Sequence, residues 1–297
     1  MYGFMIDEKQ RVAGVSVFAA VFLTGFKLVI GLLTGSLGLL SEALHSGLDL
    51  VAAIITFFSV RISDNPPDKQ HNFGHGKVEN LSAFLETILL FITCFWIISE
   101  ASDRLISGKT NIEVNAWSYI VVVTSIVVDF TRSRALGRVA KRHNSQALEA
   151  DALHFSTDIW SSAVVLLGLI CANFGFFVAD SVAALIVALI VIYVSYKLGR
   201  RSIEVLLDYA PTDKVTKIEG VLKTLSEIDT FHSLKIRTAG ADTFVSVIVI
   251  LNPQLKLTQA HEICDKVERE ICKEVKRCDV FVHVEPQNQK PDIKHYS

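Results

Sequence analysis

Six long apolar stretches constrain the fold of this chain more than any other feature. About 20 consecutive apolar residues in a helix span the hydrocarbon core of a bilayer, where every backbone polar group must be satisfied within the segment. The 51% share of hydrophobic residues and the mean hydropathy of +0.41 agree with such a setting. We therefore expect an α-helical membrane protein with six transmembrane helices, at residues 11–33, 37–61, 80–100, 115–133, 148–171 and 177–198.

The distribution of basic residues predicts how these spans are oriented. Lys and Arg are concentrated from the end of the fourth span to the fifth and from the end of the sixth span onward, at Arg132, Arg134, Arg138, Lys141, Arg142, Lys197, Arg200 and Arg201. Because loops rich in Lys and Arg stay on the cytoplasmic side, both termini are expected in the cytoplasm. The segment before the first span lacks the cleavage pattern of a secretory signal. The expected location is the cell (inner) membrane, crossed several times and surrounded by lipid.

After the sixth span the chain becomes more polar, which predicts a second domain. We expect a transmembrane domain over residues 1–208 and a cytoplasmic domain over 209–297. Alternating apolar residues predict strands, and amphipathic runs predict helices, one of them starting at an N-cap-like Thr258. In chain order the predicted elements are a helix at 212–225, strands at 232–238 and 243–251, a helix at 258–276 and a strand at 280–284. This α-β-β-α-β order predicts a small α+β domain.

A short motif occurs twice inside the apolar stretches. Its copies read Ala-Leu-His-x-x-x-Asp and contain His45 and Asp49 in the second stretch and His154 and Asp158 in the fifth. Residues four apart lie on one face of a helix, so each pair can point at a common target. Two imidazoles and two carboxylates are suitable ligands for a tetrahedral divalent metal ion, with zinc as the first candidate.

The alternative is that these His and Asp side chains only hydrogen-bond between helices. Ionised groups at membrane depth cost at least ~2.5 kcal/mol each on insertion scales, so four of them on two helices are hard to explain by packing alone. A metal ion that compensates both carboxylates is the simpler explanation.

A second cluster lies in the polar segment between the second and third spans. It reads Asp68-x-x-His71-x-x-x-His75-Gly76-Lys77. One carboxylate and two imidazoles, with water or a fourth group, could hold zinc. A solvated polar loop is the alternative on spacing alone. Its expected position at the cytoplasmic mouth favours a capture or regulatory metal site.

The C-terminal domain offers a weaker set of candidate ligands, namely His232, His261, His283 and Glu285. His283 and Glu285 are two residues apart on a predicted strand and therefore share a face. Surface histidines are common, so an ordinary exposed set is an equal alternative.

Other classes of function are less well supported. A net charge of -2 and the lack of a nucleic-acid motif argue against nucleic-acid binding. The odd number of cysteines and the lack of a C-x-x-C pair argue against a disulfide framework or a thiolate zinc site. No H-E-x-x-H motif or nucleophile elbow accompanies the candidate ligands, so a membrane zinc hydrolase, or another enzyme, is not expected. A metal-gated sensor or scaffold is a further alternative, against which the intact ligand pairs argue.

Together, the six spans, the two H-x-x-x-D pairs, the D-x-x-H-x-x-x-H-G-K loop and the C-terminal domain resemble the cation diffusion facilitator family, in particular its bacterial zinc/iron efflux branch. The resemblance covers nearly the whole chain. It implies a homodimer that exports a divalent cation in exchange for protons, with no cofactor beyond the metal itself. It also implies a transport site at His45, Asp49, His154 and Asp158 and a loop site at Asp68, His71 and His75.

The resemblance further implies a charge interlock between subunits, formed by Lys77 and Asp208, and a metallochaperone-like tail that dimerises and can bind metal. Relatives place His at Ile248 and Asp at Glu285, so a two-metal centre in the tail is in doubt, and one ion or none are the alternatives. Many bacterial relatives carry Asp at His45, whereas His is typical of zinc-selective members. Zinc is therefore the first expectation, followed by iron(II), cadmium, cobalt and manganese.

The expected mechanism is alternating access. Zinc enters from the cytoplasm past the loop cluster, binds the four intramembrane ligands and is released outside as protons replace it. Histidine suits this exchange, because it titrates near neutral pH and binds metal in its neutral form.

Overall fold

The computed structural model describes residues 2–35, 37–107, 116–173 and 177–287. The chain forms two compact units, Met1–Ile203 and Glu204–Ser297. The domain boundary expected from the sequence, at 208/209, falls shortly after this division.

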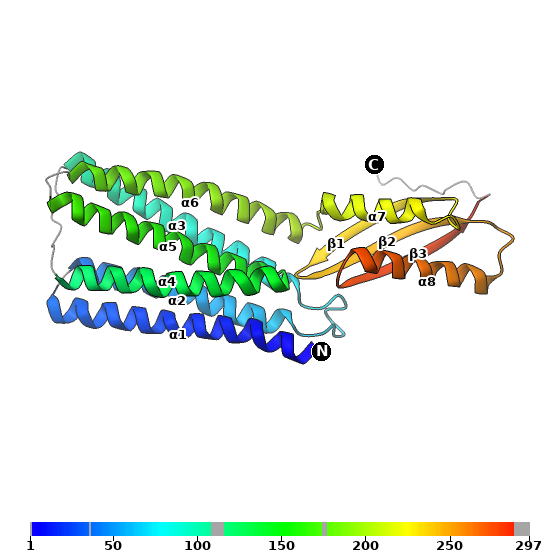
Figure 1. Ribbon diagram of the computed structural model, residues 1–297, viewed down its shortest axis with the longest axis horizontal. Coiled ribbons are helices and arrows are strands. Elements are labelled where there is room, and N and C mark those ends of the chain that lie inside the picture. Colours follow the sequence, from blue (N-terminus) through cyan, green and yellow to red (C-terminus); the bar gives the residue numbers. More distant parts are fainter. Residues whose placement is uncertain (1, 36, 108–115, 174–176, 288–297) are drawn as a thin grey trace. The chain divides into compact units, whose positions relative to one another are not determined.

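The first unit is a bundle of long helices (Figure 1). Its helices are α1 (Tyr2–Thr34), α2 (Leu37–Ser63), α3 (Lys77–Ser107), α4 (Ala116–His143), α5 (Gln146–Asn173) and α6 (Phe177–Leu206). Successive helices run in opposite directions, so α2 and α5 are antiparallel. Each predicted span lies within one of these helices, apart from position 115, which lies outside the described residues.

Three stretches of the described helices are long and apolar enough to cross a membrane, namely Glu8–Thr34, Glu42–Ser63 and Lys77–Asp103. In α4 and α5 the apolar residues are interrupted by charged ones, among them Asp129, Arg132 and Asp151, and the bundle buries all three. Ionisable groups within membrane segments normally face the bundle interior in this way. The charges of α4 and α5 are therefore compatible with a helical membrane domain.

Small side chains allow the helices to approach closely, as association within lipid requires. A Cβ atom added at Gly199 of α6 would lie 2.7 Å from Cγ2 of Thr87 on α3, so a glycine is needed at this crossing. Large apolar side chains such as Phe18 and Phe95 point outward and are 75% and 76% exposed, as a lipid-facing surface requires. Buried alanines line the helix contacts, among them Ala13, Ala20, Ala53, Ala83, Ala147 and Ala150.

The second unit is an α+β domain whose element order confirms the predicted one. It contains α7 (Thr212–Thr224), β1 (Thr230–Ala239), β2 (Asp242–Leu251), α8 (Leu257–Glu274) and β3 (Cys278–Pro286). The central strand β2 pairs antiparallel with β1 and parallel with β3. α8 begins one residue before the predicted Thr258, because the Gln259 side chain caps the helix by accepting a hydrogen bond from the Lys256 N–H over 3.0 Å.

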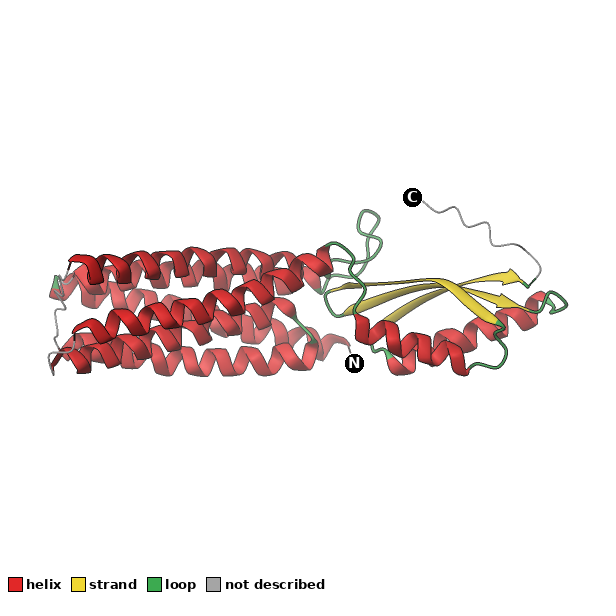
Figure 2. Cartoon of the chain, turned by 90° about the horizontal axis from the view of Figure 1, so that it is seen from above, coloured by secondary structure: helices red, strands yellow, loops and turns green. Residues whose placement is uncertain are grey.

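Both helices of this unit cover the same face of the sheet (Figure 2). The core between them is formed by Ile218 and Leu222 of α7, Val267 and Ile271 of α8, and Val245, Val247, Val249 and Leu251 of β2. Alternate residues of a strand point to opposite faces, so Ile248 lies on the other face. His232 of β1 and His283 of β3 both pair with Ile248, which places these three residues in one row across that face.

Candidate metal centres

α2 and α5 bring the two copies of the repeated motif together inside the bundle. Nε2 of His154 lies 3.0 Å from Oδ1 of Asp49 and 3.8 Å from Oδ2 of Asp158. Nε2 of His45 lies 3.8 Å from Oδ1 of Asp158. One ligand atom from each of His45, Asp49 and Asp158 lies within 4.8 Å of the others. The four candidate ligands therefore lie at one place, contributed equally by two antiparallel helices.

This intramembrane group is shielded from solvent. Asp49, His154 and Asp158 are 8%, 2% and 9% exposed, and the edge of the His45 ring contacts Trp96 of α3, with ring centroids 6.5 Å apart. Oδ2 of Asp158 is buried without a hydrogen-bond partner within the described part of the chain. Buried polar atoms are normally paired, so this oxygen is available to a ligand. The His154–Asp49 hydrogen bond also fits simple packing between helices, and the convergence of ligand atoms from His45, Asp49 and Asp158 is what favours a metal site.

Four other acidic groups of the described helices each have a partner. Lys27 contacts Glu42 at 3.1 Å, Arg132 contacts Asp129 at 3.2 Å, Ser16 donates to Asp151 over 3.3 Å and Thr56 donates to Glu86. Glu42 and Asp129 are therefore neutralised by cations, whereas Oε2 of Glu86 and Oδ1 of Asp151 are buried without a hydrogen-bond partner within the described part of the chain, as is Oδ2 of Asp158.

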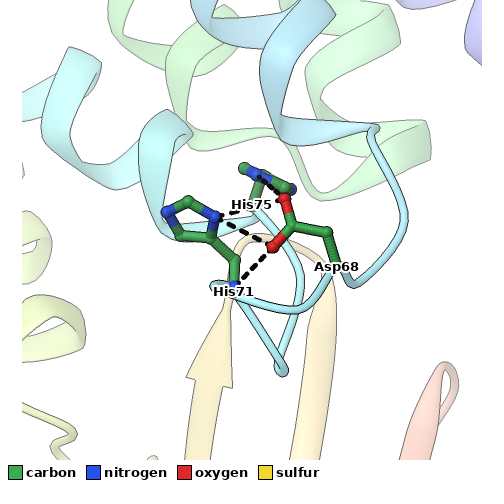
Figure 3. A group of neighbouring side chains, drawn as sticks. All are labelled: Asp68, His71 and His75. Carbon is green, nitrogen blue, oxygen red and sulfur yellow. Dashed lines mark hydrogen bonds and ion pairs between the residues drawn. The ribbon is translucent and has the colours of Figure 1, made fainter.

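The second predicted cluster lies in the loop between α2 and α3 (Figure 3). Nδ1 of His71 lies 3.2 Å from Oδ1 of Asp68, and Nε2 of His75 lies 3.4 Å from Oδ2 of the same carboxylate. The two imidazole centroids are 4.4 Å apart. One ligand atom from each residue lies within 4.8 Å of the others. The loop thus presents two nitrogens and a carboxylate to a common position.

Backbone hydrogen bonds hold the loop in this conformation. Oδ1 of Asp68 accepts from the N–H groups of Gln70 and His71, over 2.8 and 2.6 Å. Gly74, at φ +75°, donates to the His71 carbonyl over 2.9 Å, and this positive φ favours glycine. The pKa of Asp68 is lowered, chiefly by the hydrogen bond from the backbone N–H of His71. The stabilisation from the ionised carboxylate is therefore present above the ordinary pKa of aspartate and is lost only as the pH falls through the lower folded-state value.

We expect Asp68→Asn to keep the loop conformation but to weaken zinc binding there by at least about 10-fold. The amide oxygen can still accept both backbone hydrogen bonds, whereas the anionic ligand is removed. Calorimetric titration in an Asp49→Asn, Asp158→Asn background, which lacks both intramembrane carboxylate ligands, measures the change. Lys69→Ala, in the same loop, is the control and should bind like the parent. Equal affinity in the Asp68→Asn variant would rule out the loop site.

The structure brings together only part of the C-terminal ligand set. Nε2 of His232 lies 3.3 Å from Oε2 of Glu285, and His283 lies in the row of His232 with Ile248 between them. His261 is exposed on α8, where it contacts Asp265 at 3.9 Å. Among the described residues, groups of three ligands occur in the bundle and in the α2–α3 loop. The tail therefore shows a His–Glu pair, and a metal centre there stays a prediction.

Comparison with known proteins identifies the family. Residues 13–207 match the model of the cation efflux transmembrane domain, and residues 210–287 match the model of the cation efflux protein cytoplasmic domain, named ZT_dimer. The chain belongs to the cation diffusion facilitator family. It is accordingly a multi-pass membrane protein with a cytoplasmic C-terminal domain, and it is a cation efflux transporter rather than an enzyme. The name of the second model marks the cytoplasmic domain of this family as a dimerisation unit.

Cation diffusion facilitator relatives match along nearly their whole length. An uncharacterised transporter of Methanocaldococcus jannaschii is 33% identical over 281 residues, which cover 94% of this chain and 98% of the relative. The cation-efflux pump FieF of Shewanella oneidensis is 30% identical over 291 residues, covering 98% and 97%. Among solved structures, the metal-bound C-terminal domain of the CzcD transporter from Thermotoga maritima is 27% identical, covers 26% of this chain and 91% of that domain, and has a TM-score of 0.25.

The charge interlock implied by the resemblance to cation diffusion facilitators stays a prediction. Lys77 is the first residue of α3 in the first unit. Asp208 follows α6 in the second unit and has a positive φ of 58°.

Sequence reasoning missed a buried ionic cluster in this cation diffusion facilitator. Nζ of Lys9 on α1 lies 2.6 Å from Oδ1 of Asp64 and 2.8 Å from Oε1 of Glu79 on α3. Glu79 also accepts hydrogen bonds from Ser63 of α2 over 3.0 Å and from Ser145, just before α5, over 2.5 Å. Lys9 is 5% exposed and Glu79 is 2% exposed. The cluster joins four helices at the end of the bundle that carries the α2–α3 loop.

Proposed function

We propose that this cation diffusion facilitator exports zinc from the cytoplasm in exchange for protons. It would act as a homodimer in the cell (inner) membrane, with its N-terminus as well as its C-terminus in the cytoplasm. The observation that carries the proposal is the gathering of His45, Asp49, His154 and Asp158 from two antiparallel helices at one buried position. Metal ions and protons are the substrates, and no further cofactor is required.

The ligand chemistry supports zinc as the transported ion. Two imidazoles and two carboxylates supply the nitrogen and oxygen donors that zinc accepts in tetrahedral geometry. The imidazole of His45 replaces a carboxylate that would favour harder, oxygen-preferring ions. One carboxylate from each helix also balances the two charges of the cation.

Proton coupling follows from the same ligands. Imidazole must be neutral and carboxylate ionised to bind metal, so protons and zinc compete for these groups. Alternating exposure of the buried site to the two sides of the membrane would then exchange zinc for protons. The Asp68, His71 and His75 loop would capture or sense the metal on the cytoplasmic side before it reaches the bundle.

Dimerisation is supported by the family of the cytoplasmic domain. A charge interlock between Lys77 of one subunit and Asp208 of its partner would couple the two membrane domains to the cytoplasmic dimer. The tail would tune transport through metal bound near His232, His283 and Glu285.

Iron(II) is the second candidate substrate, with cadmium, cobalt and manganese after it. Mixed nitrogen and oxygen ligands bias metal selection but do not fix it, because affinities follow the metal as well as the site. Competition among these ions in transport assays separates the candidates.

We expect His45→Asp to lower the preference for zinc over manganese by about 10-fold, because the softer nitrogen donor is replaced by a second hard oxygen donor on α2. Initial rates of metal uptake into proteoliposomes, measured with both ions, give the ratio. His261→Asp makes the same substitution at an exposed position and should leave the ratio unchanged. An unaltered ratio in His45→Asp would mean that this residue does not set the choice of metal.

A further inference from the structure

Two cysteines of the cytoplasmic domain lie side by side without a sequence motif to indicate it. Cys272 belongs to the last turn of α8, and Cys278 is the first residue of β3. Sγ of Cys272 donates a hydrogen bond to the Cys278 carbonyl oxygen over 3.4 Å, which places the Cys272 thiol beside Cys278. Both are free thiols. The structure thus contains a dithiol that spans the junction of a helix and a strand.

The connection between the two cysteines is held at both ends. Val275 is 5% exposed in the core, and its N–H donates to the Ile271 carbonyl over 3.0 Å. The Arg277 carbonyl accepts from the Thr243 N–H over 2.9 Å, and the Arg277 guanidinium lies 2.7 and 2.9 Å from the Asp242 carboxylate oxygens. The backbone between the two cysteines is therefore held in place by packing and hydrogen bonds, which favours a preorganised site.

The surroundings of the two sulfurs suit a soft cation. Cys272 is exposed and Cys278 is half-buried, so an ion from solution can reach the first sulfur and be partly shielded beside the second. The Asp279 carboxylate adds negative charge close to Cys278, and the Lys214 ammonium of α7, which donates to Thr243 over 2.8 Å, adds an opposing positive charge. Thiolates select soft and borderline ions such as cadmium and zinc over oxygen-preferring ones.

We propose that Cys272 and Cys278 form a two-thiolate site for a soft divalent cation. The site is separate from the His232–Glu285 pair, because Cys278 and Glu285 lie at opposite ends of β3. Cys278 also packs on the helix-covered face of the sheet. The inference goes beyond the proposed transport function and does not depend on which ion the bundle carries.

Metal binding here replaces two S–H bonds with two S–metal bonds and releases two protons to solvent, while water completes the coordination. Burial, reinforced by Cys272, raises the pKa of the Cys278 thiol to about 12. Affinity for the metal therefore rises with pH. The cytoplasm keeps both cysteines reduced and available.

Alkylation of the full-length protein in detergent, with and without Cd²⁺ alone, tests the site, with mass spectrometry reporting each cysteine separately. We expect Cd²⁺ to protect Cys272 from alkylation in the unmodified chain and the protection to be lost in Cys278→Ser. Cys264→Ser, which removes another thiol of α8, should keep the protection.

The reciprocal variant, Cys272→Ser, gives a second test that holds even if Cys278→Ser misfolds. Because Cys272 is exposed, Cys272→Ser should fold normally and should lose the thiolate-to-cadmium charge-transfer absorption that the unmodified chain shows. Equal alkylation of Cys272 with and without Cd²⁺, or an unchanged absorption band in Cys272→Ser, would overturn the proposal.

Discussion

Replacement of Asp49 or Asp158 by Asn is expected to reduce zinc transport by more than about 100-fold, because each change removes a direct anionic ligand, whereas loss of even an outer-shell partner costs 10- to 100-fold. The cation would then meet a site with only one compensating carboxylate. Initial rates of zinc uptake into proteoliposomes that contain the purified protein measure the effect. Asparagine has nearly the shape of aspartate, so the helices should still pack.

Asp103→Asn is the matched control for these two substitutions. It makes the same change at an exposed position on α3 and should transport at the unmodified rate. A folded Asp49→Asn variant with normal zinc flux would contradict the assigned site. It would favour a metal-gated sensor or scaffold in which the buried pairs serve packing.

Lys9→Met is expected to destabilise the protein by about 3–5 kcal/mol, because removal of one partner leaves uncompensated charge in a buried cluster. Asp64 and Glu79 would both lose the ammonium group that they share at 2.6 and 2.8 Å. Methionine keeps most of the side-chain volume, so the loss of stability measures the effect of removing the charge. The measurement is the thermal unfolding midpoint of the detergent-solubilised protein.

Arg201→Ala is the control for this prediction. The Arg201–Glu149 pair lies at 2.8 Å, but its side chains are 55% and 42% exposed. Exposed pairs contribute at most about 1 kcal/mol, so this variant should melt close to the unmodified chain. Equal midpoints for Lys9→Met and Arg201→Ala would show that the buried cluster does not stabilise the bundle.

The residue pattern within one segment predicted the features that depend on that segment alone. The apolar stretches have the length of a membrane span, and helices lie at all six positions because the hydrogen bonds of a helix are satisfied within the segment. The spacing of His45 and Asp49 placed both on one face of α2, and antiparallel α5 supplied the other pair. The alternation in Thr243 to Leu251 likewise predicted β2, because one face of this strand packs under two helices.

Contacts between distant residues could not be predicted in this way. Lys9 and Glu79 are 70 residues apart, and a single sequence does not fix the axial position of α1 relative to α3. The Cys272–Cys278 contact depends on the tight connection between α8 and β3, which no C-x-x-C spacing indicates. In the tail, strand pairing brings His232 near Glu285, whereas His261 lies on a helix with Asp265 as its neighbour.

Zinc movement driven by an imposed pH gradient tests the central claim most directly. In proteoliposomes without a zinc gradient, acidification of one side should drive zinc toward that side, because protons displace the metal from His45, Asp49, His154 and Asp158. We expect this movement to stop when the pH gradient is collapsed and to be lost in the Asp49→Asn, Asp158→Asn double variant. Zinc flux that is indifferent to the pH gradient, or that persists in the double variant, would contradict proton-coupled transport through this site.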